Sequence, residues 1–278
     1  MIVVINFGGQ YAHLIARRVR DLGVKSELAQ PDISPQDVKK FNPDAIVFSG
    51  SPFSVYQKGA PKVDSKIYNL KIPTLGICYG QQLMARQLGG IVTSHSAKQF
   101  GKESLSVAKS DLFKGLASPQ TVWFSHGDHV DKLPKGFKTI GSTKSAKIAA
   151  MENADKKLYG IQFHPEVTHT QNGTQILTNF LFKIAKVKKD WNISEVKKEI
   201  IANLRKQIGN DKVLMAVSGG VDSTVAATLL KEATPKNLYL VFIDTGLLRS
   251  YDLSDLKKVA KAVKFENFKT VNASKRFL

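Results

Sequence analysis

The chain contains one cysteine, Cys78, which lies between two glycines in the stretch GICYG. An apolar run precedes this stretch, and a helical pattern follows it. A nucleophile flanked at two residues' distance by small residues, between a strand and a helix, is the pattern of a nucleophile elbow. The backbone N–H groups and the dipole of the following helix would favour the thiolate form. The stretch therefore indicates a nucleophilic thiol, although a buried structural cysteine fits these residues equally well.

A second stretch, YGIQFHPEV, supplies a partner for the thiol. It places His164 just beyond a predicted strand and Glu166 two residues later. The imidazole could accept the thiol proton, and the carboxylate could orient the imidazole. A single histidine in a loop would indicate little, but together with the elbow it predicts a Cys-His-Glu triad. We expect Cys78 and His164 to face each other at the carboxyl edge of one parallel sheet, with Glu166 beyond the imidazole.

The stretch VLMAVSGGVDSTVAATLL reads as a strand, a glycine-rich loop and a helix. No Gly-Lys-Ser/Thr follows the loop, so it is not a Walker A sequence. Its backbone N–H groups, its hydroxyls and the helix N-terminus still form the parts of a phosphate cradle, and Asp222 could hold Mg²⁺ beside the phosphates. The alternative is a simple tight turn between strand and helix. The residues predicted to bind ATP are Ser218, Gly219, Gly220, Val221, Asp222, Ser223 and Thr224.

The elements that must position these residues alternate along the chain. The runs IVVINF, DAIVFSG and IPTLGI predict strands, and AHLIARRVRDLG, VDSKIYNL and QQLMARQLGG predict helices. Short buried strands separated by helices indicate an α/β fold with a mostly parallel sheet. Residues from 91 to about 151 are richer in strand patterns, namely GIVTS, ESLSVAK, TVWFSHGDHV and AKIAAMEN. KLYGIQF then predicts a strand, and TQILTNFLFKIAKV a helix.

The polar stretch KVKKDWNIS suggests a boundary between two domains. We assign residues 1–187 to the first domain, 188–193 to a linker and 194–278 to a second α/β unit. The second unit begins with the helical pattern SEVKKEIIANLRKQIG and continues with the strand KVLMAV, the glycine-rich loop, and the helix TVAATLLKEA. The strand LYLVFID, the helix LSDLKKVAKAV and a last strand, FKTV, follow.

Charge, apolar content and cysteine content indicate which partners and which location to expect. The formal net charge is +18, but the lysines are scattered, and no basic stripe interleaved with aromatic residues is present. We therefore expect no nucleic-acid partner, while a basic surface suits small phosphorylated substrates. No window approaches the ~20 apolar residues of a membrane span, so we expect no membrane partner. A single cysteine excludes an internal disulfide and favours a reducing, cytoplasmic location.

The motifs GICYGQQ and FHPE resemble those of class I glutamine amidotransferases, and the resemblance covers about the first 185 residues. It implies that Cys78 is the nucleophile, His164 the base and Glu166 its orienting partner. Such enzymes hydrolyse the side-chain amide of glutamine through a glutamyl thioester and release ammonia.

The same resemblance implies the residues around the substrate. FSGSP matches the family's oxyanion loop, with Ser51 where the family usually has glycine. The backbone N–H groups of Ser51 and Tyr79 would then stabilise the oxyanion. The residues implied to line the glutamine pocket are Gln82 and, from the segment SHGD, Ser125, His126 and Asp128.

SGGVDS resembles the signature of ATP pyrophosphatases, which have an adenine-nucleotide α-hydrolase-like fold and cleave ATP between its α- and β-phosphates. An amidotransferase followed by this loop resembles ligases that aminate XMP and release AMP and pyrophosphate. This implies glutamine, ATP and XMP as substrates, Mg²⁺ as a cofactor and a homodimer formed through a region beyond Leu278. The second domain is then truncated, so we expect little XMP amination by these 278 residues. Asn6 departs from the aspartate usual in this family.

Two other functions remain open. The chain could be a glutaminase that supplies ammonia to another acceptor, or a catalytically inactive nucleotide-binding protein. The glycine-rich loop fused behind the amidotransferase motifs argues against the first, and the intact triad argues against the second.

Overall fold

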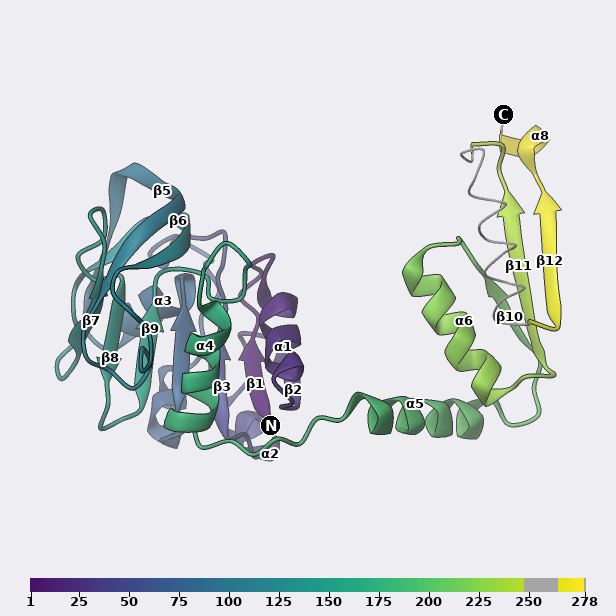
Figure 1. Ribbon diagram of the computed structural model, residues 1–278, viewed down its shortest axis with the longest axis horizontal. Helices are drawn as coiled ribbons and strands as arrows, with labels where there is room; N and C mark the ends of the chain where they lie inside the picture. The colour runs from purple at the N-terminus through teal and green to yellow at the C-terminus, as the bar shows by residue number, and fades with distance from the viewer. Residues whose placement is uncertain (248–264, 278) are drawn as a thin grey trace. The chain divides into compact units, whose positions relative to one another are not determined.

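The computed structural model describes residues 1–247 and 265–277, with the backbone alone at 95–99. It divides into two compact units, Met1–Trp191 and Asn192–Leu278 (Figure 1). Within the described residues, no helix combines the length and apolarity that a membrane crossing requires. Each unit has its own sheet and its own buried core.

The first unit is built on a nine-stranded sheet of order β2-β1-β3-β4-β9-β8-β7-β5-β6. The first five strands in this order are parallel, and the remaining four are antiparallel. The parallel strands are β2 (Ser26–Ala29), β1 (Ile2–Ile5), β3 (Ala45–Phe48), β4 (Thr74–Ile77) and β9 (Leu158–Ile161). The antiparallel strands are β8 (Ala150–Asn153), β7 (Lys138–Ser142), β5 (Ile91–Val107) and β6 (Gln120–Lys132). The expected α/β fold with a mostly parallel sheet is confirmed.

Helices cover both faces of the parallel half, which explains its continuous apolar runs. Side chains alternate between faces along each strand, so Ile2 and Val4 share one core and Val3 and Ile5 another. The first core contains residues of α1 (Ala12–Asp21), α4 (Gly173–Thr178) and η2 (Asn179–Ile184). The second contains residues of α2 (Pro35–Lys40), η1 (Ser65–Leu70) and α3 (Tyr79–Gln87).

The structure differs from the sequence-based elements in four short segments and one long one. Strands β2 and β7 and helices α2 and α8 (Ser274–Phe277) were not predicted, because each has at most six residues and no clear period. The two strands expected at GIVTS and ESLSVAK are one strand, β5. Polar residues in the middle of β5 interrupt the strand pattern of the sequence. In the structure, the pairing with β6 shifts register in this stretch, between Ser94 and Gln99.

The end of the first unit lies within the segment interpreted as a linker. Asp190 and Trp191 both donate backbone hydrogen bonds to Gly23 O, at 3.0 and 3.1 Å. The Asp190 carboxylate accepts from Lys25 N at 2.6 Å, and the Arg20 guanidinium lies 5.3 Å from the centre of the Trp191 ring. The structure thus places these residues with the first unit.

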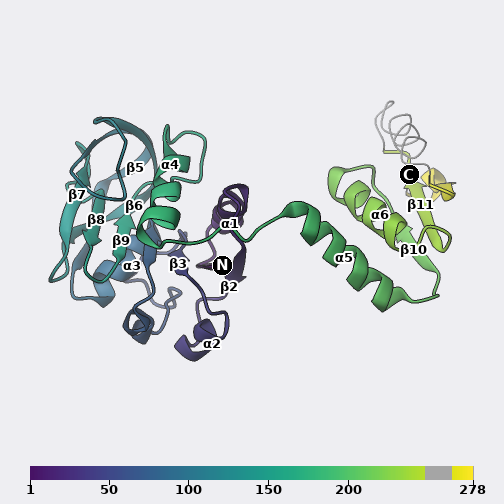
Figure 2. The same cartoon turned by 60° about the horizontal axis from the view of Figure 1, so that its bottom comes forward.

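The second unit contains α5 (Ile193–Ile208), β10 (Val213–Ala216), α6 (Val221–Ala233), β11 (Leu238–Asp244), β12 (Asn267–Asn272) and α8 (Ser274–Phe277). The three strands are parallel, in the order β10-β11-β12. Helices α5 and α6 lie side by side (Figure 2) and are joined by an ion pair of 2.6 Å between Lys197 and Glu232. The helix expected at residues 253–263 lies outside the described residues.

Candidate active site

Cys78 occupies the turn between β4 and α3. Its backbone has φ 55° and ψ −109°, a conformation that side-chain-bearing residues rarely adopt. The register of β4 against β9 pairs Ile77 with Ile161, and Cys78 N donates to Ile161 O at 2.8 Å. This is the sharp turn that the sequence predicted, and it holds Cys78 at the carboxyl edge of the parallel sheet.

Two glycines make this turn possible. A Cβ atom at Gly80 would lie 2.5 Å from Phe48 Cβ and 2.6 Å from Phe48 O. A Cβ atom at Gly76 would lie 2.6 Å from Gly80 C. Strand β3, strand β4 and the start of α3 therefore approach more closely than any larger residue allows.

Gly80→Ala should destabilise the first unit by ~1–3 kcal/mol or more, because the clash involves backbone as well as side-chain atoms. Gly220→Ala is a matched control, since Gly220 has φ −73° and a Cβ there meets only the Ser218 hydroxyl, at 3.4 Å. Urea unfolding of both variants measures the difference. Equal stability of the two variants would contradict the close approach described here.

His164 lies three residues beyond the end of β9 and is held on several sides. Its backbone N–H donates to Trp123 O at 3.0 Å, and its carbonyl accepts from Thr170 Oγ1 at 2.5 Å. Nδ1 of the ring lies 2.7 Å from Glu166 Oε1, and Arg18 Nε donates to Glu166 O at 2.9 Å. The carboxylate is an acceptor, so Nδ1 carries the proton and Nε2 is available for other chemistry.

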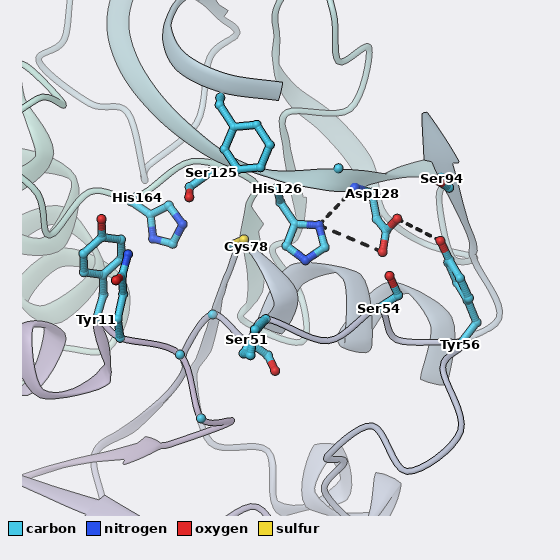
Figure 3. A pocket seen from close by; sticks show the side chains of 17 residues that line it. Tyr11, Ser51, Ser54, Tyr56, Cys78, Ser94, Ser125, His126, Asp128 and His164 are labelled. Carbon is cyan, nitrogen blue, oxygen red and sulfur yellow. Dashed lines mark hydrogen bonds and ion pairs between the residues drawn. The ribbon is translucent and has the colours of Figure 1, made fainter. Parts of the chain in front are cut away.

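Cys78 and His164 face the same pocket (Figure 3). They flank Gly50, where a Cβ atom would lie 3.3 Å from His164 Cε1 and 3.8 Å from Cys78 Cβ. Burial alone would lower the pKa of His164, but the charges of Glu166 and Cys78 and hydrogen bonding to both outweigh it. The net pKa of His164 lies well above its ordinary value, which favours the imidazolium form.

This raised pKa makes stability depend on pH. The stabilisation from an imidazolium beside Glu166 is fully present below about pH 6.5, the unfolded pKa of histidine, and is lost as pH rises through the folded pKa. Glu166→Gln should therefore lower the free energy of unfolding more at pH 6 than at pH 9, with Glu199→Gln, an exposed carboxylate of α5, as the control. Urea titrations at both pH values measure this. A larger loss at pH 9 would contradict the charged pair.

The pocket around the two residues has a volume of about 590 Å³. Its walls come from the loop after β1, the loop after β3, the elbow, strands β5 and β6, and the loop after β9. The residues that line it are Gly8, Gly9, Gln10, Tyr11, Gly50, Ser51, Pro52, Ser54, Tyr56, Cys78, Ser94, Phe100, Ser125, His126, Gly127, Asp128 and His164.

The two expected oxyanion donors are both near Cys78. Ser51 lines the pocket, and its Oγ accepts from Phe53 N at 3.3 Å. The Tyr79 side chain points away into the core, where its hydroxyl donates to Pro61 O. Neither the Ser51 nor the Tyr79 backbone N–H donates a hydrogen bond to another described residue. Both donors therefore remain available for an oxygen that develops negative charge.

The other end of the pocket carries His126 and Asp128 (Figure 3). Asp128 N donates to His126 Nδ1 at 3.0 Å, so the proton of a neutral His126 lies on Nε2. Burial lowers the pKa of His126 and favours that neutral form. Asp128 Oδ1 accepts from the Tyr56 hydroxyl at 2.8 Å, whereas Oδ2 is buried with no hydrogen-bond partner among the described residues.

Gln82 is placed differently from the expectation. It lies one helical turn after Cys78, but its side chain is fully buried and is not among the residues that line the pocket. Its Nε2 donates to Asp128 O at 2.8 Å and to Gln162 Oε1 at 3.1 Å. The bond to Asp128 O holds the Gln82 amide behind Asp128, which is part of the pocket wall. The Gln82 side chain therefore supports that wall.

Sequence reasoning missed several residues that the structure places at the site. Tyr11 packs edge-on against His164, with ring centroids 5.1 Å apart, and Tyr56 holds Asp128. Gln162, two residues before His164 in the same motif, has its Nε2 3.8 Å from Cys78 Sγ. The glycines of FGGQY, directly after the first strand, could have indicated a functional loop.

The glycine-rich loop of the second unit has the expected strand–loop–helix form. Gly219 has φ +81°, and α6 begins at Val221. The Ser218 and Ser223 hydroxyls lie 3.2 Å apart, and Thr224 Oγ1 donates to Gly220 O at 2.9 Å. The loop is exposed, and the start of a 13-residue helix offers N–H groups to an anion.

The donor set for Mg²⁺ in this loop is small. Asp222 lies in the first turn of α6, and the described residues contain no group of three His, Cys, Asp or Glu side chains that could hold a metal. A single carboxylate beside a phosphate cradle fits Mg²⁺, which keeps several waters and is held largely by substrate phosphates.

Comparisons with protein families agree with this division of the chain. A model of the class I glutamine amidotransferases matches residues 3–184, and a model of NAD synthase matches residues 193–276. The first match includes the complete Cys-His-Glu arrangement, and the second includes the glycine-rich loop.

The curated relatives include glutamine-hydrolysing GMP synthases from Clostridium novyi (strain NT) and Carboxydothermus hydrogenoformans. Each is 46% identical over the whole of this chain, which spans 54% and 55% of their respective lengths. The chain thus spans about half the length of the curated relatives it matches.

A solved structure from Thermoplasma acidophilum, described as one subunit of a GMP synthase, is 32% identical with a TM-score of 0.61. The match covers 71% of this chain and 96% of that protein. A glutamine amidotransferase from Thermotoga maritima, 16% identical with a TM-score of 0.54, shares the fold. With the elbow, the triad and the family match over residues 3–184, this chain belongs to the class I glutamine amidotransferase family.

Proposed function

We propose that this chain hydrolyses glutamine at Cys78 and that the ammonia aminates XMP to GMP in a reaction driven by ATP, which yields AMP and pyrophosphate. The observation that carries the proposal is the 46% identity to GMP synthases over the full chain, triad and glycine-rich loop included. The chain covers 54% of that relative. The proposed amination of XMP is therefore supported by the similarity to a GMP synthase and by the glycine-rich loop of the second unit.

The geometry at Cys78 supports hydrolysis by the following steps. His164 Nε2 takes the thiol proton, and the imidazolium is stabilised by Glu166 at 2.7 Å. The thiolate attacks the carboxamide carbon, and the oxyanion is held by the N–H groups of Ser51 and Tyr79. His164 then gives its proton to the departing nitrogen, which leaves as ammonia. Water activated by His164 hydrolyses the thioester to glutamate and restores the thiol.

The orientation of glutamine is inferred from one buried acceptor of the pocket. Asp128 Oδ2 has no hydrogen-bond partner among the described residues and lies 4.0 Å from His126 Nδ1. A cationic α-ammonium group would satisfy this acceptor, whereas a carboxylate would not. The amino-acid end of glutamine therefore lies beside Asp128, with Ser125 and His126 along the same wall, and its carboxamide lies beside Cys78.

The ATP site is the loop from Ser218 to Thr224. Its hydroxyls and helix N-terminus would hold the phosphates, and Asp222 would bind Mg²⁺, which neutralises phosphate charge when present. We also propose a cytoplasmic location, supported by the single cysteine, and a homodimer, supported by the family resemblance alone.

A second candidate acceptor is favoured by the family match of the second unit. Residues 193–276 match NAD synthase, so the ammonia could convert the carboxylic acid precursor of NAD to its amide. This alternative keeps the chemistry at Cys78 and changes only the acceptor.

The experiment uses the protein purified from its source, with glutamine labelled at the amide nitrogen, ATP and either acceptor. We expect the label in GMP and none in NAD. Label in NAD alone would overturn the XMP assignment while leaving glutaminase activity intact. Absence of glutamate formation with either acceptor would support the inactive nucleotide-binding alternative.

A further inference from the structure

Gln162 is a buried polar residue that the mechanism above does not use. It follows β9 directly, its side chain has no exposed surface, and its backbone N–H donates to Ala149 O at 2.8 Å. Its Nε2 lies 3.8 Å from Cys78 Sγ, within the range of a hydrogen bond to sulfur. A primary amide placed in the core against the nucleophile calls for a physical reason, since an apolar side chain would fill the same space at lower desolvation cost.

The direction of this amide is determined by a chain of contacts that ends at a backbone carbonyl. Asp128 O can only accept, so the Gln82 amide must present Nε2 to it, at 2.8 Å. The same Nε2 lies 3.1 Å from the Gln162 side chain, which must therefore present its oxygen. Gln162 consequently turns its NH₂ group toward Cys78. The reverse orientation would set two NH₂ groups against each other and a carbonyl against the sulfur.

We propose that Gln162 is a positioning residue that donates a hydrogen bond to the Cys78 thiolate, and that Gln82 fixes the direction of that bond. A thiolate is a much better acceptor than a thiol, so such a donor stabilises the reactive form selectively. The inference deepens the proposed function, because the thiolate it stabilises is the one that would attack glutamine.

The test uses alkylation of the thiol by iodoacetamide at pH values from 5 to 9, followed by intact mass. Cys78 is the chain's only cysteine and lines a pocket of about 590 Å³, so one added carbamidomethyl group reports on it alone. Sulfur displaces iodide from the reagent carbon, and only the thiolate reacts at an appreciable rate. No substrate is needed, so failure of this inference is distinguishable from failure of the proposed glutaminase activity.

Two variants remove the donor in different ways. Gln162→Met keeps an unbranched side chain of similar size but has no N–H. Gln162→Glu keeps the shape and the acceptor for Gln82 and places a carboxylate against the sulfur. Since one hydrogen bond contributes about 0.5–1.5 kcal/mol, alkylation of Gln162→Met at pH 7 should slow about 2- to 10-fold. The midpoint of the curve should move to higher pH, further for Gln162→Glu, while the plateau rate at high pH stays unchanged.

Gln81→Met is the matched control. Gln81 is the neighbouring buried glutamine of α3, and its Nε2 donates to Ile148 O at 3.1 Å instead of joining this chain. Its variant should reproduce the wild-type midpoint. The titratable groups that line the pocket are unchanged in every variant, namely His164, His126, Asp128, Tyr11 and Tyr56, and so is Glu166, which contacts His164 Nδ1.

Midpoints of Gln162→Met and Gln162→Glu equal to that of the wild type would overturn the proposal. So would a matching shift in Gln81→Met, because the effect would then belong to core packing. If Gln162→Met fails to fold, as judged by circular dichroism and gel filtration, Gln82→Met gives the answer. Loss of the Gln82 amide frees the orientation of Gln162 and should move the midpoint in the same direction by a smaller amount, whereas an unchanged midpoint would refute the chain of contacts.

Discussion

Cys78→Ala should reduce the rate of glutamine hydrolysis by ~10⁴-fold or more, because without the sulfur no thioester can form. The rest of the pocket, including the Ser51 and Tyr79 donors, remains in place. The measurement is glutamate formation with saturating glutamine, beside circular dichroism to establish that the variant folds. Alanine is small and apolar, so the buried turn should accept it.

The same substitution has an internal control in the second unit. The Ser218–Thr224 loop belongs to Asn192–Leu278, so nucleotide binding there should be equal in Cys78→Ala and the parent. A loss of ATP binding would show that the variant damages more than the thiol chemistry. Glutamine hydrolysis within about tenfold of the parent would refute Cys78 as the nucleophile.

His164→Asn should lower kcat by ~10³- to 10⁴-fold, since both proton transfers pass through His164 Nε2. Asparagine cannot take the thiol proton, and it leaves Glu166 buried without its partner, whose Nδ1 lies 2.7 Å away. Steady-state kinetics from pH 6 to 9 measure the loss. High pH should restore part of the activity, because the thiol then ionises without a base.

His169→Asn is the control for this substitution. His169 lies five residues further along the same loop and stacks on Trp123, with ring centroids 4.5 Å apart, but it does not line the pocket. Its variant should retain kcat within about threefold, the ordinary spread for a residue away from the chemistry. Equal losses in both variants would mean that the loop is being disrupted and that His164 is not the base.

The residues with local signatures could be predicted from the sequence. The elbow at Cys78 follows from glycine spacing between a strand and a helix, and the partner at His164 follows from a polar motif after a buried strand. Both lie at the carboxyl ends of neighbouring parallel strands, β4 and β9. Because carboxyl ends of parallel strands meet at one edge of the sheet, this juxtaposition can be predicted without knowledge of side-chain packing.

Directions of side chains could not be predicted in the same way. Gln82 has the expected place on α3, yet its amide turns to Asp128 O, a carbonyl 46 residues away. Trp191 reads as part of a polar linker, but Arg20 and Gly23 hold it on the first unit. Such contacts are made between residues that lie far apart in the sequence, so the spacing of residues along the chain does not predict them.

Strand β6 supports both ends of the pocket. The Trp123 carbonyl holds the backbone of His164, and five residues later Asp128 closes the opposite end. A strand advances about 3.3 Å per residue and stretches very little, so β6 fixes the distance between the two ends of the pocket. Because this distance is fixed, recognition of the proposed substrate, glutamine, depends on the length of its side chain. An amide one methylene shorter, such as asparagine, cannot reach Cys78 while its ammonium group stays on Asp128, and the mismatch should cost it about 1–3 kcal/mol.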